Sequence, residues 1–282
     1  MDRVGKEAVL PSTLVAFFDA QLQPDGLTQT DLRTLASFGV GAALVPAHAG
    51  GTRADPEALL AHFKNLAEVQ AGRLLRAGIR PFLALGIPAG CGPEHDVEQV
   101  LDLLPETRGD ARVVAIGLIG LGDGSLPAER LFTRQLELAD ELDLPVVVEV
   151  ASTERAKLMR RTLALLSESG LPPGRILLAR AHTEDLPVLL GCGHFAGLSV
   201  RSGRVAVAEA VAAVQAHGPQ RLVLGSDAGD GATDLLALAR TAAALEAAGL
   251  SDPVIRKVTG GNAMSLLGVD PDVIQLASNK PR

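Results

Sequence analysis

The feature that most constrains the fold is an alternation, repeated eight times, of short apolar segments with longer segments of helical period. Several of the short segments are apolar over nearly their whole length, as in VVVEV and RLVLGS. Such runs are typical of parallel strands covered by helices. The predicted strands comprise residues 14–19, 42–47, 81–87, 112–118, 145–150, 175–180, 194–200 and 221–226.

The intervening segments carry helix start and stop signals. Asp55 precedes Pro56 as a capping residue, while Gly170 and Gly218 follow helical segments as stops. Eight strand–helix units at a mean spacing of about 30 residues predict one closed (β/α)8 barrel; an open doubly wound sheet is the alternative. We expect a single domain over residues 1–282, with the barrel at about 12–268 and a frayed tail at 277–282. The predicted helices comprise residues 56–78, 127–142, 152–169, 205–217, 234–248 and, after the eighth unit, 252–267.

Composition excludes several functional classes. The chain has 26 Lys and Arg against 33 Asp and Glu, a net charge of −7, with seven Phe and no Tyr or Trp. An acidic chain poor in aromatics is not expected to bind nucleic acids in general. No apolar run approaches the roughly 20 residues that span a bilayer, and the amino terminus has no signal-peptide pattern. We therefore expect a cytoplasmic protein without membrane contact. The two cysteines, Cys91 and Cys192, are too few for a disulfide framework.

Active sites of (β/α)8 barrels lie at the carboxyl ends of the strands. Three of the six histidines, His48, His95 and His182, follow strands at that end. Their spacing matches no compact metal-binding motif. Satisfied loop histidines are the simpler interpretation for His48 and His182, with His48 the better candidate for function, and His95 is expected in the capping turn of the helix that follows the third strand.

An arginine-rich segment follows the seventh predicted strand. Arg201 and Arg204 lie in the sequence VRSGR, and Arg180 ends the neighbouring sixth strand. Three guanidinium groups near one barrel mouth are suited to binding phosphate or carboxylate groups. Solvated surface charge is the alternative interpretation.

The chain resembles the TatD-related metal-dependent hydrolases, an amidohydrolase-like branch of the (β/α)8 barrels. The resemblance extends from FFD at residues 17–19 to GNA at 261–263. It implies one or two divalent metals that generate a hydroxide nucleophile for hydrolysis, often of phosphodiesters. The clearest stretches are VVAIGLIGL at 113–121, RQLELADELDLPVVV at 134–148, FAGLSV at 195–200 and GSDAG at 225–229.

The ligand positions implied by the resemblance are mostly substituted in the first half of the chain. The family motif Asp-x-His-x-His corresponds to Asp19, Gln21 and Gln23, so that both imidazoles are replaced by amides. The family's Gly-x-His-Pro corresponds to residues 86–88, which lack the histidine, and Leu118 takes the place of the metal-bridging glutamate.

In the second half of the chain the pattern is only partly retained. Glu149 stands where the resemblance implies a histidine, and Arg180 stands at the next histidine position, with His182 two residues later. Ser226 and Asp227 match the family's Ser-Asp. Whether Arg180 or His182 takes the ligand position is left open by the sequence.

These substitutions predict that the inherited metal site is empty. Amides are weak ligands for zinc-like ions, and a leucine is none. A guanidinium about 4 Å from a dication costs several kcal/mol even at an effective dielectric of roughly 20. We expect Arg180 to occupy the place of the metal, with Glu149 and Asp227 as its counter-charges.

The leading functional hypothesis is a pseudo-hydrolase or repurposed barrel without a cofactor. It would bind an anionic small molecule or a protein partner at the barrel mouth where the family has its active site. A homo-oligomer is also possible. The candidate ligand-binding residues are Asp19, Gln21, Gln23, His48, Arg180, His182, Arg201 and Arg204.

Two enzymatic alternatives remain open. A metal-independent enzyme would use Asp227 or Glu149 as acid or base. A hydrolase of phosphodiester, other ester or amide bonds would need a rebuilt Zn, Mn or Mg site. Its ligands would be Asp19, His48, Glu149, His182 and Asp227.

Overall fold

The structure, a computed structural model, describes residues 16–48, 56–91, 98–104, 109–150, 152–231 and 233–274. The predicted tail at 277–282 lies outside the described residues, as do residues 12–15 at the start of the predicted barrel. None of the described helices is long and apolar enough to cross a membrane.

Eight parallel strands form one sheet in the order of the sequence, from β1 to β8. Each overlaps a predicted strand, which confirms the barrel prediction, and the consecutive order rules out the open doubly wound alternative. The strands are β1 (Phe17–Asp19), β2 (Val40–Pro46), β3 (Arg80–Ala84), β4 (Val113–Ile119), β5 (Val146–Glu149), β6 (Ile176–Ala179), β7 (Phe195–Ser199) and β8 (Leu222–Gly225).

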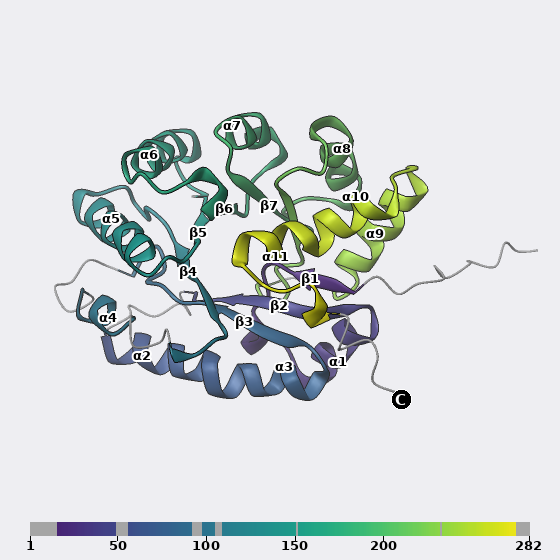
Figure 1. Cartoon of the computed structure of the whole chain (residues 1–282), viewed down its shortest axis with the longest axis horizontal. Helices are drawn as coiled ribbons and strands as arrows, with labels where there is room; N and C mark the ends of the chain where they lie inside the picture. Colours follow the sequence, from purple (N-terminus) through teal and green to yellow (C-terminus); the bar gives the residue numbers. More distant parts are fainter. Residues whose placement is uncertain are drawn as a thin grey trace, which may run out of the picture.

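The helices surround the strands, with α1 to α3 on one side and α5 to α8 on the other (Figure 1). The predicted helix over 56–78 is continuous from α2 through the π-helix η2 to α3. The helices and helical turns are η1 (Pro24–Gly26), α1 (Gln29–Ser37), α2 (Pro56–Lys64), η2 (Asn65–Gln70), α3 (Ala71–Ala77), α4 (Glu98–Leu103), α5 (Leu126–Glu141), α6 (Arg155–Glu168), η4 (Pro173–Arg175), η5 (Thr183–Asp185), α7 (Leu186–Gly191), α8 (Val207–His217), α9 (Ala237–Ala247), α10 (Asp252–Arg256), η6 (Lys257–Gly261) and α11 (Asn262–Leu267).

Three helices, α1, α4 and α7, are absent from the predicted set. They have nine, six and six residues, so they contain too few turns for a clear helical period. The start of α1 is nevertheless fixed by a capping box, in which the Thr28 hydroxyl accepts a hydrogen bond from the backbone N–H of Asp31.

The barrel closes just beyond the ends of β1 and β8. The backbone N–H of Asp227 donates to the carbonyl of Gln21 at 2.9 Å, and that of Gln23 donates to Ala228 at 2.8 Å. The loops meet so closely that a Cβ on Gly26 would lie 2.1 Å from the carbonyl oxygen of Gly229. This seam, formed by residues 19–26 and 225–229, replaces a regular ladder between the first and last strands.

Buried apolar side chains form two separate clusters. The larger lies between the strands and the helices. The smaller fills the barrel, where Phe18, Phe82 and Leu177 pack with Met264 and Leu267 of α11. Helix α11 crosses the amino-terminal end of the strands (Figure 1), so the carboxyl ends form the remaining barrel mouth.

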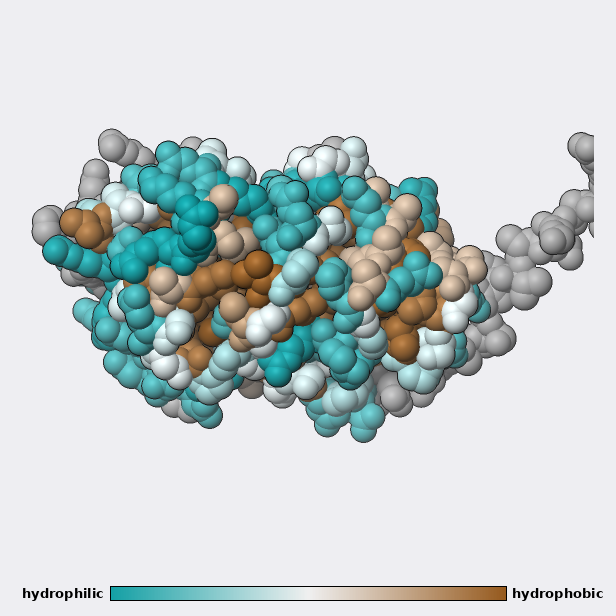
Figure 2. Space-filling view, turned by 90° about the horizontal axis from the view of Figure 1, so that it is seen from above, coloured by the Kyte–Doolittle hydropathy of each residue, from teal (hydrophilic) through white to brown (hydrophobic). Residues whose placement is uncertain are grey.

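One face of the outer surface is largely polar. Figure 2 views the side that carries α6, α7 and α8: hydrophilic residues predominate, with apolar residues in a band across the middle. Both cysteines are free thiols, with Cys91 buried and Cys192 exposed.

Candidate functional site

Arg180 lies at the centre of an ion-pair cluster in the barrel mouth. Its Nη1 lies 2.8 Å from Oε1 of Glu149, at the end of β5. Its Nη2 lies 3.0 Å from Oδ1 of Asp227 and 2.8 Å from Oδ2 of Asp230, both beyond β8. The side chain of Arg180 is only 11% exposed. The structure thus brings Glu149, Arg180 and Asp227 into contact, as the sequence suggested.

Arg201 is the second cation of the cluster. Its Nε lies 3.2 Å from Oδ2 of Asp227, and its Nη2 lies 3.3 Å from Oδ2 of Asp230. The fully buried Asp227 therefore has each carboxylate oxygen paired with a different guanidinium. We call Glu149, Arg180, Arg201, Asp227 and Asp230 the arginine cluster.

Backbone conformation places two members of this cluster. Arg180 and Asp227 have φ angles of 57° and 52°, in the left-handed region that costs non-glycine residues about 1–3 kcal/mol. Ala179 already faces the barrel interior, so strand alternation would turn residue 180 toward the helices. The left-handed turn breaks that alternation, and the guanidinium reaches the mouth.

His182 does not share the mouth with Arg180. Its side chain is 42% exposed, and Nδ1 lies 3.7 Å from Oε1 of Glu184. Its backbone N–H donates to Asp185 at 2.8 Å at the start of η5. Arg180, not His182, therefore takes the position left open by the sequence.

Asp19 is buried in the seam of the barrel rather than in the arginine cluster. Its carboxylate accepts from the backbone N–H of Ser226 at 2.9 Å, from the Ser226 hydroxyl and from the backbone N–H of Gln21 at 3.2 Å. Burial raises the pKa of this carboxyl from 3.8 to about 6, although the hydrogen bonds from Ser226 and Gln21 oppose the rise. Asp19 thus links β1 to β8.

The other substituted positions offer few ligand atoms. Gln21 and Gln23 are buried, and Nε2 of Gln21 has no hydrogen-bond partner among the described residues. Leu118 packs in the apolar cluster inside the barrel, with Val147 and Leu177.

His48 belongs to a separate histidine pair. Its Nε2 lies 2.9 Å from Oδ2 of Asp25, and its backbone N–H donates to Nε2 of His62 at 3.3 Å. The two imidazole centroids are 4.8 Å apart. Burial, and then the neighbouring His48, lower the pKa of His62. His95 lies outside the described residues.

The five residues of the rebuilt-metal alternative do not converge. Asp19 binds Ser226, His48 binds Asp25, and His182 faces solvent. Within the described ranges, no group of three or more His, Cys, Asp or Glu side chains is placed to hold a metal ion.

The sequence interpretation identified Arg204 at the mouth but missed Asp230. Asp230 was not identified, although it is the second acidic residue in SDAGD at 226–230 and follows a glycine of positive φ. Arg204 lies near the cluster, as predicted. Among the described residues, however, its side chain has neither an ion pair nor a hydrogen bond.

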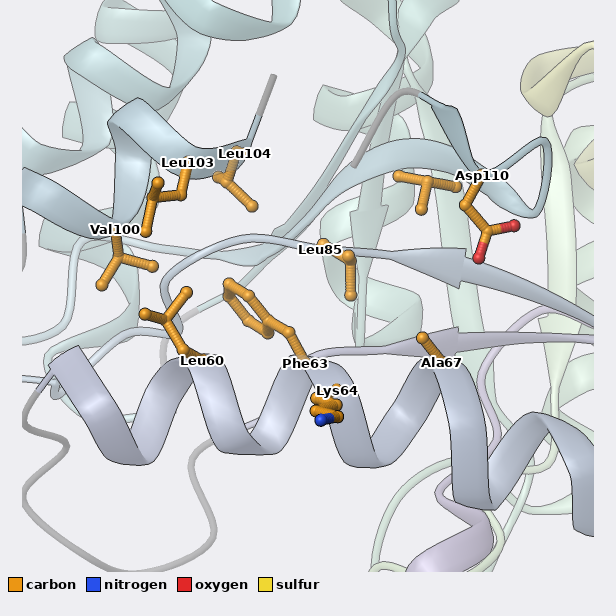
Figure 3. A pocket seen from close by; sticks show the side chains of 10 residues that line it. Leu60, Phe63, Lys64, Ala67, Leu85, Val100, Leu103, Leu104 and Asp110 are labelled. Carbon is orange, nitrogen blue, oxygen red and sulfur yellow. The ribbon is translucent and has the colours of Figure 1, made fainter. Parts of the chain in front are cut away.

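The molecule also has an apolar groove away from the mouth, with a volume of about 340 Å³. Leu60 and Phe63 of α2 face Leu103 and Leu104 at the end of α4 across it (Figure 3). The carboxylate of Asp110, at its edge, is already bound to Arg112. Apart from Asp110 and Lys64, the described lining is apolar.

Eight parallel strands in sequence order, with charged side chains at their carboxyl ends, define the protein as a (β/α)8 barrel. No protein-family model matches the chain. It is 25% identical over 224 residues to an uncharacterized metal-dependent hydrolase of Methanocaldococcus jannaschii, covering 79% of this chain and 88% of that protein.

Solved structures agree with this relationship. The TatD-like protein of Archaeoglobus fulgidus superposes with a TM-score of 0.76 at 26% identity, over 90% of this chain and all of the other. A TatD homolog of Escherichia coli K12 has a TM-score of 0.64 at 22% identity, over 92% of this chain and 100% of that one, and shows the shared fold. In sequence and in fold, the chain is therefore similar to the TatD-like metal-dependent hydrolases of the amidohydrolase superfamily.

The family implies a divalent metal, but the described side chains at this mouth do not fit one. Glu149, Asp227 and Asp230 are already paired with guanidinium groups. Leu118 supplies no ligand atom, and the buried amides at 21 and 23 are poor ligands for zinc-like ions. A metal would have to displace Arg180 from its three carboxylate partners.

Proposed function

We propose that this chain is a pseudo-hydrolase, a TatD-like barrel that binds an anionic small molecule at its mouth without metal-dependent hydrolysis. The observation that carries the proposal is the guanidinium of Arg180, which pairs with Glu149, Asp227 and Asp230 at the carboxyl ends of the strands. Because each of these three carboxylates already has a cationic partner, none is left unpaired to bind a metal at the mouth.

Electrostatics favours the guanidinium over a metal at this position. Arginine keeps its charge at all physiological pH values, so Arg180 cannot give way by losing a proton. At about 4 Å and an effective dielectric of roughly 20, its repulsion of a dication amounts to about 8 kcal/mol. Removing it would leave the fully buried Asp227 with fewer counter-charges.

Arg204 supplies the cationic group for an anionic ligand, although the arginine cluster itself has one more carboxylate than guanidinium groups. Arg180 and Arg201 neutralise carboxylates within the cluster, whereas Arg204 adds a positive charge beside them. An anion entering the mouth would meet that charge, and guanidinium groups bind phosphate and carboxylate through paired hydrogen bonds.

Metal content and activity test this proposal together. The full chain is incubated with excess zinc or manganese, freed of unbound ions by gel filtration and analysed by plasma mass spectrometry. Hydrolysis of bis(p-nitrophenyl) phosphate is then measured with and without chelator. We expect far less than one metal ion per chain and no chelator-sensitive hydrolysis. One stoichiometric ion with chelator-sensitive hydrolysis would overturn the proposal and support a working metal-dependent hydrolase.

A further inference from the structure

The loop between β7 and α8 borders a cavity beside the arginine cluster. Its volume is about 410 Å³, within the range of small-molecule sites. The lining is confined to residues 200–207, Glu209 and Asp234, so nearly all of it comes from one loop and the first turn of α8. Arg201 belongs both to this lining and to the cluster.

Backbone hydrogen bonds fix the shape of this loop. Val200 and Val205 form a parallel bridge, and the N–H of Arg201 donates to the carbonyl of Val205 at 3.2 Å. The N–H of Arg204 donates back to the carbonyl of Arg201 at 3.1 Å. Gly203, with a φ of 76°, provides the left-handed residue that this tight turn needs. Arg201 and Arg204 therefore extend from one ordered turn.

Arg204 differs from its two neighbours because no described residue pairs with its guanidinium group. Arg180 and Arg201 pair with Asp227 and Asp230, whereas the Arg204 guanidinium has no ion pair or hydrogen bond to any residue that the structure describes. Burial, and then the positive charge of Arg180, lower the pKa of Arg204. The negative charges of Asp227 and Glu149 oppose this decrease, but both carboxylates bind other guanidinium groups. The donors of the partly buried Arg204 guanidinium are therefore open to an incoming anion.

The two acidic residues that line the cavity, Glu209 and Asp234, are not counter-ions of Arg204. Oε2 of Glu209 accepts from the backbone N–H of Ala206 at 2.7 Å. Oδ2 of Asp234 pairs with Arg240 at 2.8 Å, and Oδ1 accepts from the N–H of Leu236 at 3.0 Å. Both carboxylates are therefore held by groups other than Arg204.

We propose that this cavity is an anion subsite in which Arg204 binds the phosphoryl group of a small phosphate ester. The inference rests on the proposed function, because it assumes a mouth without metal. Phosphate, which can accept on several oxygens, is favoured over a planar carboxylate because the lining residues carry several donors. Besides the guanidinium, these are the Ser202 hydroxyl and the N–H groups of Ser202 and Gly203, which donate to no carbonyl in the described part of the chain.

The position in the fold is consistent with this ligand. Barrel enzymes frequently bind phosphate in the loops that follow strands seven and eight. Here the loop after β7 carries Arg204, and the loop after β8 carries Asp227 and Asp230, which hold Arg201 in place. The ester's remaining group would occupy the rest of the cavity.

Inorganic phosphate is the probe for the test. Thermal unfolding of the full chain is followed during phosphate titration, with sodium chloride at matched ionic strength as the salt control. We expect a saturable rise in Tm for the wild type and binding weaker by at least about tenfold in Arg204→Gln. Arg33→Gln, an equal charge change on the exposed face of α1, should bind phosphate as the wild type does.

Further variants keep the result interpretable. Circular dichroism verifies that Arg204→Gln is folded; if it is not, Arg204→Lys and Ser202→Ala replace it, and each should weaken phosphate binding. Absence of saturable binding to the wild type, or equal binding by all folded variants, overturns the inference.

The test separates this inference from the proposed function. A metal-free protein that binds acetate or citrate at the mouth but not phosphate overturns only the phosphate subsite. Phosphate binding that disappears with chelator and accompanies stoichiometric metal overturns the proposed function as well, because the anion would then be bound by the ion.

Discussion

The carboxylate of Asp19, at the end of the first strand, accepts hydrogen bonds from both the backbone N–H and the hydroxyl of Ser226, just beyond the last strand. The two residues are 207 positions apart in the sequence. The aspartate that matches the family's metal-binding motif is thus bound within the seam that closes this barrel.

The burial of Asp19 predicts a pH-dependent stability. Its pKa is raised to about 6 in the folded state, so folding favours the protonated form and stability is lost as pH rises toward and through that value. Relative to Asp19→Asn, the wild type should lose about 2–3 kcal/mol of unfolding free energy between about pH 4 and about pH 7.5. Urea unfolding of both proteins across this range measures the difference. A difference independent of pH would contradict the prediction.

The seam should not tolerate a side chain at Gly26. A Cβ there would lie 2.1 Å from the carbonyl oxygen of Gly229, a backbone atom that cannot rotate away. We expect Gly26→Ala to destabilise the protein by about 1–3 kcal/mol. Gly174→Ala is the control, because a Cβ there meets nothing within 4 Å. Chemical denaturation measures the free energy of unfolding of both variants. Equal values would contradict the prediction and show that the two loops can separate freely.

Loss of Arg180 should destabilise the fold far more than loss of His182. Arg180→Gln removes a cation that is 11% exposed from three carboxylates, at an expected cost of about 3 kcal/mol. The exposed His182 makes no close contact of this kind, and His182→Ala should change stability by less than about 0.5 kcal/mol. Arg180→Lys, which keeps the charge, should fall between them. Urea unfolding provides the comparison, and similar losses for Arg180→Gln and His182→Ala would contradict it.

Restoring the imidazoles implied by the family resemblance should restore metal binding only if Arg180 is also replaced. The variant Gln21→His/Gln23→His/Arg180→His gains three neutral ligands and frees Asp227 from one guanidinium. Its affinity for zinc, measured by competition with a chromophoric chelator, should exceed that of the wild type by at least about a hundredfold, or about 2.7 kcal/mol.

The matched control for this experiment is Gln21→His/Gln23→His, which retains Arg180. It should bind zinc no better than the wild type, because the guanidinium still pairs with Glu149 and Asp227. Equal zinc affinity in the double and triple variants would show that Arg180 is not what excludes the metal.

Parts of the site were predictable because neighbouring strands bring their ends together in any barrel. Glu149 and Arg180 end adjacent strands, and Asp227 ends the strand two further on, so their contact follows from strand order once the barrel is recognised. Asp230 and the seam were not predictable in this way. They depend on how loops fold beyond the strands, and periodicity carries no information about those loops.

The sequence by itself determined the eight-stranded barrel and the residue types, two glutamines and a leucine, at positions 21, 23 and 118. It did so because apolar periodicity and residue type are properties of the chain alone. Only the tertiary structure decided that Arg180 rather than His182 enters the mouth, that Asp19 closes the barrel and that Arg204 lacks a counter-ion among the described residues. Those outcomes depend on left-handed backbone turns and on contacts between loops distant in sequence, because ion pairing depends on the distance between charges in the folded structure.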